Sequence, residues 1–129
     1  MKSSSAVSAY VQASYENAPP IKIVHMMYEG ALRYLGQAQR LDPRAQLREF
    51  TDRLNRADAV VSELRLSLDD AHAPELCEQL TGLYRFVESQ IREALLGQTS
   101  EPLEGACSVL QVLLEGWREI DVEDPQRSA

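Results

Sequence analysis

The stretch PPIKIVHMMYEGALRYLGQA (19–38) decides the fold, because its spacing predicts a helix with an unusually wide apolar face. At about 100° per residue, its apolar side chains fill a continuous arc of about 180°. A core-facing helix of a small bundle needs an arc of only about 100°. The stretch therefore predicts a core face and, beside it, a surplus apolar surface that includes Ile23, Met27 and Tyr34.

Three further periodic segments follow the first. Helices are predicted near 20–41, 44–70, 75–96 and 102–120, with prolines at or before their starts. Asp42 and Ser100 are predicted caps or turn formers, and Gly97 is the predicted residue that ends the third helix. No stretch alternates with period two, so we expect no sheet. The short connections predict an all-α fold, an antiparallel up-down-up-down four-helix bundle.

The second and third predicted helices carry apolar stripes of ordinary width, about 100°. The second stripe consists of Leu47, Phe50, Leu54, Ala57, Val61, Leu64 and Leu68. The third consists of Leu76, Leu80, Leu83, Tyr84, Val87, Ile91 and Leu95, and it leaves Phe86 and Leu96 outside. Both helices are expected to face the core in the usual way.

The fourth predicted helix has a wide apolar arc of about 160°, which includes Val109 and is extended by Val112. Gly30 flanks the first wide arc, and Gly105 and Gly116 flank this one. A mid-helix glycine costs up to about 1 kcal/mol relative to alanine, so we expect another group to approach closely there. The first and last helices of such a bundle are neighbours, so their surplus arcs could jointly line a groove. Alternatively, a loop, a terminal segment or a second subunit covers them.

The length and composition predict one globular domain. The chain has 129 residues, a hydrophobic content of 44% and a net charge of −7. The acidic balance argues against nucleic acid and against anionic membrane surfaces as partners. No apolar run approaches a membrane span or a signal-peptide core, so a cytoplasmic location is expected. We expect a weakly ordered N-terminal arm over 1–18, the bundle over 19–121 and a disordered tail over 122–129.

The residues that could carry chemistry lack the necessary spacing. Cys77 and Cys107 begin successive antiparallel helices, about 20 Å apart along the bundle, which excludes a disulfide between them. His25 is interpreted as a satisfied boundary residue, since no carboxylate or nucleophile accompanies it at a useful spacing. Neither metal-ligand pairs nor a phosphate-binding loop is present. We therefore expect no enzyme activity, no cofactor and no metal.

Four stretches carry a resemblance to a known family. They are MMYEGALRYLGQA (26–38), RADAVVSELRLSLD (56–69), LCEQLTGLYRFV (76–87) and LLEGWREI (113–120). In this order they resemble the signature stretches of the flagellar secretion chaperones, the FliS family. The similarity covers roughly residues 6 to 121, and VSAY, with Val7 and Tyr10, resembles the aromatic N-terminal segment of that family.

The resemblance implies a four-helix bundle with an N-terminal segment packing across it. It also implies that the protein holds flagellin in the cytoplasm by its disordered C-terminal segment, without nucleotide or metal. Such a chaperone prevents premature polymerisation and presents flagellin to a component of the type III export gate. Tyr84 and Trp117 match the family too, and we assign them to core packing.

An amphipathic partner helix would bind an apolar trough through anchors about one turn apart. The predicted partner-binding groove is formed by Ile23, Met27, Tyr34, Val109 and Val112. Val7, Tyr10 and Val11 fall at helical spacing, and we expect this arm to occupy part of the trough in the free protein. The alternative is a homodimeric bundle with a structural or regulatory role that uses the same surface. Whether a co-chaperone or regulatory adaptor docks on the charged faces of the second and third helices stays open.

Overall fold

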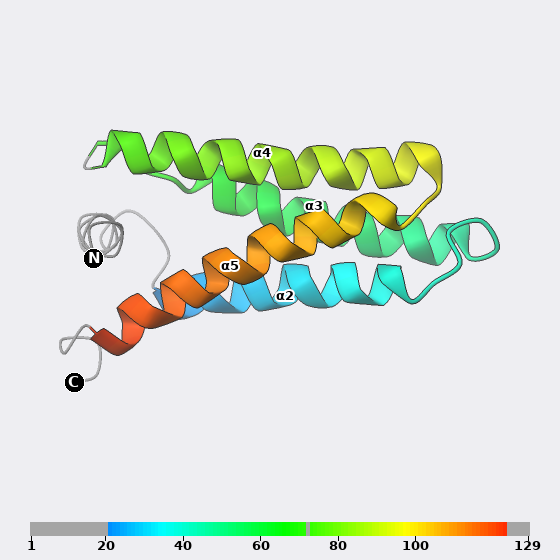
Figure 1. The fold of residues 1–129 in the computed structure, drawn as a ribbon, viewed down its shortest axis with the longest axis horizontal. Coiled ribbons are helices and arrows are strands. Elements are labelled where there is room, and N and C mark those ends of the chain that lie inside the picture. The colour runs from blue at the N-terminus through cyan, green and yellow to red at the C-terminus, as the bar shows by residue number, and fades with distance from the viewer. Residues whose placement is uncertain (1–20, 72, 124–129) are drawn as a thin grey trace.

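The computed structural model describes residues 21–71 and 73–123, with side chains as far as Glu119. Figure 1 labels its elements α2 (Ile21–Gln39), α3 (Leu47–Leu66), α4 (Pro74–Gly97) and α5 (Glu101–Glu123). All four are α-helices, and the described ranges contain no strand. The predicted all-α fold is confirmed.

Each helix packs against two neighbours. α2 contacts α3 and α5, and α4 contacts the same two helices. Consecutive helices run in opposite directions, and α5 returns to lie against α2 (Figure 1). The antiparallel bundle is therefore confirmed, and the first and last described helices are neighbours as predicted.

The core consists of the central stripe of every helix. Its buried side chains include Tyr28, Leu35, Phe50, Leu54, Val61, Tyr84, Val87, Ile91, Leu103, Leu110 and Leu114. Burying one such side chain stabilises the fold by about 1.5–3 kcal/mol, so these layers dominate the stability. Phe86 and Leu96 are exposed, as the stripe of the third predicted helix indicated.

Two members of the predicted stripes are exposed rather than buried, namely Leu47 and Leu83. Leu47 is the first residue of α3, where the turn before it provides little cover. Leu83 lies in the N-terminal half of α4, and α5 diverges from that half of α4 in Figure 1. A helical wheel does not distinguish the two ends of a helix. A neighbouring helix that crosses at an angle covers the side chains at one end and leaves those at the other end exposed.

Asp42 organises the connection between α2 and α3. Its Oδ1 accepts hydrogen bonds from the backbone N–H groups of Arg44 and Ala45, both at 3.0 Å. These bonds stabilise the carboxylate and hold the pKa of Asp42 below its ordinary value. The predicted role of Asp42 as a turn former is confirmed. Helix α3 begins at Leu47 instead of 44, because the intervening residues complete this turn.

The end of α4 differs from the prediction. Gly97 is still helical, and Gln98 adopts the left-handed conformation with φ of 49°. The N–H of Gln98 bonds to the carbonyl of Ala94, which closes the helix. In the following turn, Thr99 Oγ1 accepts a hydrogen bond from the N–H of Glu101 at 3.3 Å. Ser100 directly precedes α5 and its carbonyl accepts a hydrogen bond from the N–H of Leu103 at 3.0 Å, so its predicted role as a turn former is confirmed.

Replacing Gln98 with glycine is expected to raise the free energy of unfolding by about 1 kcal/mol. A residue with a Cβ pays a steric penalty in the left-handed region, and glycine does not. Urea denaturation followed by circular dichroism measures the change. Gln79→Gly is the matched control: Gln79 is an exposed interior residue of α4, where glycine should destabilise by about 0.5–1 kcal/mol. A loss of stability in both variants would contradict the prediction.

Several predicted boundaries fall on other residues or outside the described chain. α3 ends at Leu66 rather than near 70, and α5 continues to Glu123, into the predicted tail over 122–129. The remainder of that tail, and the arm over 1–18 with its predicted packing across the bundle, lie outside the described residues. The division into arm, bundle and tail therefore stays a prediction.

Candidate partner-binding surface

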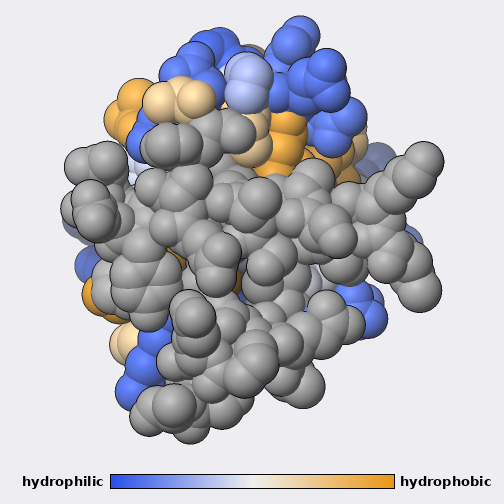
Figure 2. All heavy atoms as spheres, turned by 90° about the vertical axis from the view of Figure 1, so that its left-hand side faces the viewer, coloured by the Kyte–Doolittle hydropathy of each residue, from blue (hydrophilic) through white to orange (hydrophobic). Residues whose placement is uncertain are grey.

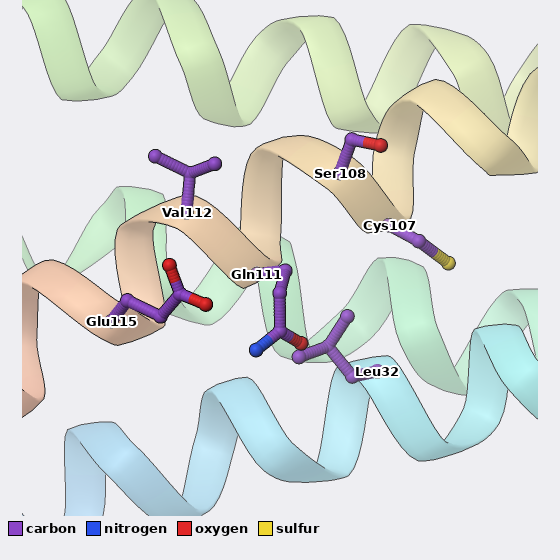
Figure 3. A pocket seen from close by; sticks show the side chains of 6 residues that line it. All are labelled: Leu32, Cys107, Ser108, Gln111, Val112 and Glu115. Atoms are coloured by element: carbon purple, nitrogen blue, oxygen red, sulfur yellow. The ribbon is translucent and has the colours of Figure 1, made fainter.

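An open pocket of about 400 Å³ lies on the seam between α2 and α5. It is lined by Leu32 of α2 and by Cys107, Ser108, Gln111, Val112 and Glu115 of α5 (Figure 3). The residues of α5 recur at intervals of three and four, so they form one stripe along the outer side of that helix. The lining mixes apolar and polar side chains: in Figure 3, Gln111 extends from α5 towards Leu32, whereas Val112 and Ser108 point away from α2. Such a surface can bury apolar side chains of another molecule and bond its polar groups.

Cys107 belongs to the apolar part of this pocket. Burial raises the pKa of its thiol, because a thiolate would lose solvation there. The thiol donates a weak hydrogen bond to Gln39 Oε1, with 3.7 Å between sulfur and oxygen. It is therefore a protonated, poorly nucleophilic group, and Cys77 is also a free thiol.

Interhelical contacts join α2 and α5 on either side of the pocket along α5. Arg118 donates a hydrogen bond to Glu29 Oε2 at 2.7 Å, and this ion pair is about half exposed. Cys107 and Gln39 make the other contact. Exposed ion pairs contribute little stability, so Glu29 and Arg118 chiefly orient the two helices where they meet.

The five predicted groove residues differ in exposure. Ile23 is 45% exposed and Val112 is 66% exposed. Met27, Tyr34 and Val109 are half-buried and pack against the core. The surplus apolar surface expected from α2 and α5 is thus present mainly at Ile23 and Val112.

The structure does not place these five residues around one pocket. Val112 lines the pocket with Leu32, whereas Tyr34 interacts with Arg56 of α3 on the other seam of α2. A helical wheel gives the width of an apolar arc, but it does not tell which neighbouring helix adjoins each flank of the arc. The partner-binding roles of Ile23, Met27, Tyr34, Val109 and Val112 stay predictions, as do those of Val7, Tyr10 and Val11, which lie outside the described residues.

Most of the pocket-lining residues were not identified from the sequence. Leu32 belongs to the apolar arc of α2, but it was not among the predicted groove residues. Ser108, Gln111 and Glu115 are polar, and a search for apolar arcs passes over them. Their regular spacing along α5 was visible in the sequence, yet only the neighbouring α2 turns that stripe into one wall of a pocket.

The flanking glycines are not required by close packing within the described chain. A Cβ on Gly105 would lie 3.7 Å from the ring of Phe86, and one on Gly30 would lie 3.8 Å from Arg33. Both distances are ordinary van der Waals contacts, and Gly116 faces open space. The predicted close approach is therefore wrong for the described part of the chain. Phe86 instead lies over Gly105 as a partly exposed aromatic side chain.

A buried cluster joins aromatic residues from three of the four signature stretches. The hydroxyl groups of Tyr28 and Tyr84 are hydrogen-bonded at 2.5 Å, and Trp117 Nε1 donates to Tyr28 Oη at 3.1 Å. The two tyrosine rings are tilted by 59°, with centroids 6.3 Å apart. All three side chains are buried, so the assignment of Tyr84 and Trp117 to the core is confirmed. Their polar atoms hydrogen-bond to one another within this cluster.

The remaining candidates for chemistry stay isolated in the described ranges. His25 is half-buried as a boundary residue, but its Nε2 has no hydrogen-bond partner among the described residues, so the predicted satisfaction does not extend to this atom. Over residues 21–71 and 73–123, no group of three or more His, Cys, Asp or Glu residues could hold a metal ion. None of the described helices has the length and apolar character that crossing a membrane requires. Figure 2 shows orange apolar atoms among blue polar ones at the end of the bundle.

An antiparallel helical bundle with exposed apolar side chains and an open pocket along one seam has the architecture of a protein-binding bundle. A family model described as "Flagellar protein FliS" matches residues 3–124, nearly the whole chain. The chain belongs to the FliS family. This is a family of chaperones and not of enzymes, and it gives the protein a chaperone role in flagellar export.

Curated relatives agree with this assignment over most of their length. The chain is 28% identical to the flagellar secretion chaperone FliS of Campylobacter jejuni over 120 residues, which cover 93% of this chain and 94% of that protein. It is 26% identical over 107 residues to the flagellar secretion chaperone FliSB of Pseudomonas aeruginosa, with coverage of 83% and 85%. The FliS of Salmonella typhimurium is 24% identical over 125 residues, which cover 93% of each chain. The predicted family resemblance is confirmed.

Proposed function

We propose that this protein is a cytoplasmic export chaperone that binds the disordered C-terminal segment of flagellin. It prevents premature filament polymerisation and delivers flagellin to the flagellar type III export gate. Membership of the FliS family supports the export role. The observation that carries the binding role is the open pocket between α2 and α5, beside the exposed side chain of Val112.

The pocket suits a helical guest. An amphipathic helix presents apolar side chains about one turn apart, and α5 offers Ser108, Val112 and Glu115 along one stripe at the same spacing. An apolar anchor that packs against Leu32 or Val112 would leave water on binding, while Gln111 and Glu115 contact polar groups of the guest.

A guest that is disordered when free needs more contact than one pocket provides. Ordering such a segment costs about 2–5 kcal/mol of the gross interaction free energy. Other exposed apolar side chains lie on neighbouring surfaces of the bundle, among them Ile23 of α2 and Phe86 of α4. We therefore expect the guest to extend beyond the α2–α5 seam and to use further apolar contacts on the bundle.

Co-expression with flagellin tests the proposed function. We expect a one-to-one complex in size-exclusion chromatography with light scattering, and we expect its loss when the C-terminal segment of flagellin is deleted. A stable homodimer that does not bind a flagellin C-terminal peptide would reject the chaperone role. It would support the alternative, in which the same apolar surface joins two copies of the chain.

Replacing Val112 with glutamate is expected to weaken binding of the flagellin C-terminal peptide at least about tenfold. A charge at this position would have to be desolvated against the apolar anchor of the guest, and tenfold corresponds to about 1.4 kcal/mol. Val112 is largely exposed, so the fold should tolerate the change. Isothermal titration calorimetry measures the affinity.

Leu96→Glu provides the matched control for this prediction. Leu96 is 81% exposed on α4 and does not line the pocket. The Leu96→Glu substitution introduces the same charge and should leave the affinity for the peptide within about twofold of the wild type. If the wild type and the Val112→Glu variant bind the peptide equally well, the α2–α5 seam is not part of the binding surface, even if the chain binds flagellin.

A further inference from the structure

The charge of the chain is unevenly distributed. Residues 33–56 contain six arginines and three acidic residues, a net charge of +3. The rest of the chain contains seven basic and seventeen acidic residues, a net charge of −10. The basic segment comprises the second half of α2, the connection to α3 and the first half of α3. The chain is thus strongly acidic, with one basic region.

The fold gathers this region into one corner of the bundle. α2 and α3 are antiparallel and packed together, so the end of one helix lies beside the start of the other (Figure 1). The arginine corner consists of Arg33, Arg40, Arg44, Arg48, Arg53 and Arg56. Tyr34 connects the arginines of α2 with those of α3. The Cζ atom of Arg33 lies 5.8 Å from the centre of the Tyr34 ring, and Arg56 of α3 interacts with the same tyrosine side chain.

Most of these arginines have no ionic partner among the residues that the structure describes. Asp52 accepts hydrogen bonds from Arg53 at 2.5 Å and from Arg56 at 3.0 Å, so one carboxylate serves two guanidinium groups. The other four arginines lie farther than 4.0 Å from every carboxylate of the described residues. Asp42 forms no ion pair within 4.0 Å with any of them; its carboxylate accepts hydrogen bonds from the backbone of the connecting turn, and only Arg44 lies close enough to lower the pKa of Asp42 by its charge.

The chemistry of the corner favours carboxylates. Every basic residue in it is arginine, whose planar guanidinium can donate two parallel hydrogen bonds to one carboxylate. An arginine that is exposed and unpaired can form such bonds without first breaking an internal ion pair. We propose that the arginine corner is a docking surface for an acidic segment of another protein.

A short acidic segment fits this surface better than an extended polyanion. The net excess of charge is only three, and attraction to anionic membranes amounts to about 1 kcal/mol for each basic residue. A membrane or a nucleic acid would also face the surrounding surface, which is acidic; Glu101 and Glu104 begin α5 at the same end of the bundle. A short segment with a few carboxylates contacts only the arginine corner and avoids the acidic surface around it.

The docking surface is separate from the pocket between α2 and α5, and only Tyr34 belongs both to the corner and to the groove predicted from the sequence. The corner belongs to α2 and α3, whereas the pocket belongs to α2 and α5. A chaperone that carries flagellin could therefore bind an acidic partner at the same time. The inference does not depend on the proposed function, since it follows from the distribution and pairing of the arginines.

Nuclear magnetic resonance of the full-length, ¹⁵N-labelled chain tests the proposal at about 0.15 M salt, where long-range attraction is screened. The probe is a capped helical peptide of alanines and four glutamates, and the control peptide has glutamine in place of glutamate. We expect saturable shifts of backbone amides within 33–56 with the glutamate peptide only. Phosphatidylserine vesicles and a DNA duplex, tested in parallel by co-sedimentation and titration, should bind more weakly than the glutamate peptide.

Two double variants with the same change in net charge locate the site. Arg40→Glu/Arg48→Glu should weaken binding of the glutamate peptide at least about tenfold, because it replaces attraction by repulsion. Lys22→Glu/Arg85→Glu reverses two exposed charges outside the corner and should change the affinity less than about threefold. Circular dichroism verifies that both variants are folded. Equal losses in the two variants, absence of shifts within 33–56, or tighter binding of vesicles or DNA would overturn the proposal.

Discussion

Replacing Tyr28 with phenylalanine is expected to lower the free energy of unfolding by about 3 kcal/mol. The Tyr28 hydroxyl is bonded to the hydroxyl of Tyr84 and accepts a hydrogen bond from Trp117 Nε1. Both partners are buried, so water cannot readily replace the lost bonds. Each buried polar group deprived of a partner costs about 1–3 kcal/mol. Urea denaturation monitored by the fluorescence of Trp117 measures the effect.

Tyr34→Phe is the matched control, because it removes the same atom from a partly exposed tyrosine of the same helix. Its effect should be below about 0.5 kcal/mol, since water replaces the contacts of a surface hydroxyl. Tyr84→Phe should have an intermediate effect, because Trp117 keeps its acceptor on Tyr28. A Tyr28→Phe variant no less stable than Tyr34→Phe would contradict the importance of the cluster. Such a result would leave the aromatic residues as packing groups only.

Replacing Glu88 with glutamine is expected to lower the free energy of unfolding at pH 7 by about 1–2 kcal/mol. Glu88 of α4 accepts hydrogen bonds from two residues of α3, namely Ser62 Oγ at 2.7 Å and Arg65 Nε at 2.8 Å. Burial alone would raise the pKa of Glu88, but these hydrogen bonds and the nearby positive charge outweigh it and lower the pKa. The carboxylate therefore joins α3 to α4 in its charged form.

The pH dependence follows from the direction of the shift. Because the pKa of Glu88 is lower in the folded state, its contribution is present above the unfolded pKa and is lost as pH falls through the folded pKa. The difference in stability between the wild type and Glu88→Gln should thus shrink in acid. Denaturation curves recorded from pH 7 down to pH 3 measure it. A difference that does not change with pH would contradict the ionic role.

Asp58 provides a control of opposite sign on the same face of α3. Burial and repulsion by Glu88 raise the pKa of Asp58, so its charged form opposes folding at neutral pH. Asp58→Asn should therefore increase stability at pH 7, and the gain should vanish below the unfolded pKa of the carboxyl. A loss of stability in Glu88→Gln together with a gain in Asp58→Asn would show that local contacts, and not net charge, determine the change in the free energy of unfolding.

Much of the fold could be predicted from local patterns. The periodic apolar stripes located four helices, and their antiparallel order followed from the short connections. Stripes such as Phe50–Leu64 and Tyr84–Ile91 are buried as predicted, because a side chain at a stripe centre faces the core at every level of the bundle. Predictions at stripe edges were less reliable, and Leu47 and Leu83 are exposed. At an edge, burial depends on the position of a neighbouring helix.

Helix ends were also difficult to predict. Gly97 was the expected left-handed residue, yet Gln98 occupies that conformation. The penalty for a Cβ in this region is only about 1–2 kcal/mol, which the packing of α4 and α5 can offset. The order of the signature stretches indicated the family, but not the contact that their aromatic residues make. Tyr28 and Trp117 are 89 positions apart, and only the bundle brings them together.

The sequence by itself determined the all-α class, the order of the helices, most of the core and membership of the FliS family, because these depend on local periodicity and on motifs along the chain. The tertiary structure decided which surfaces adjoin each other. It placed Val112 and Leu32 around one pocket, Tyr34 beside Arg56, and the arginine-bearing end of α2 beside the arginine-bearing start of α3. A single helix defines the direction of each side chain around its own axis. Only the packing of its neighbours decides whether that direction leads to core, pocket or solvent.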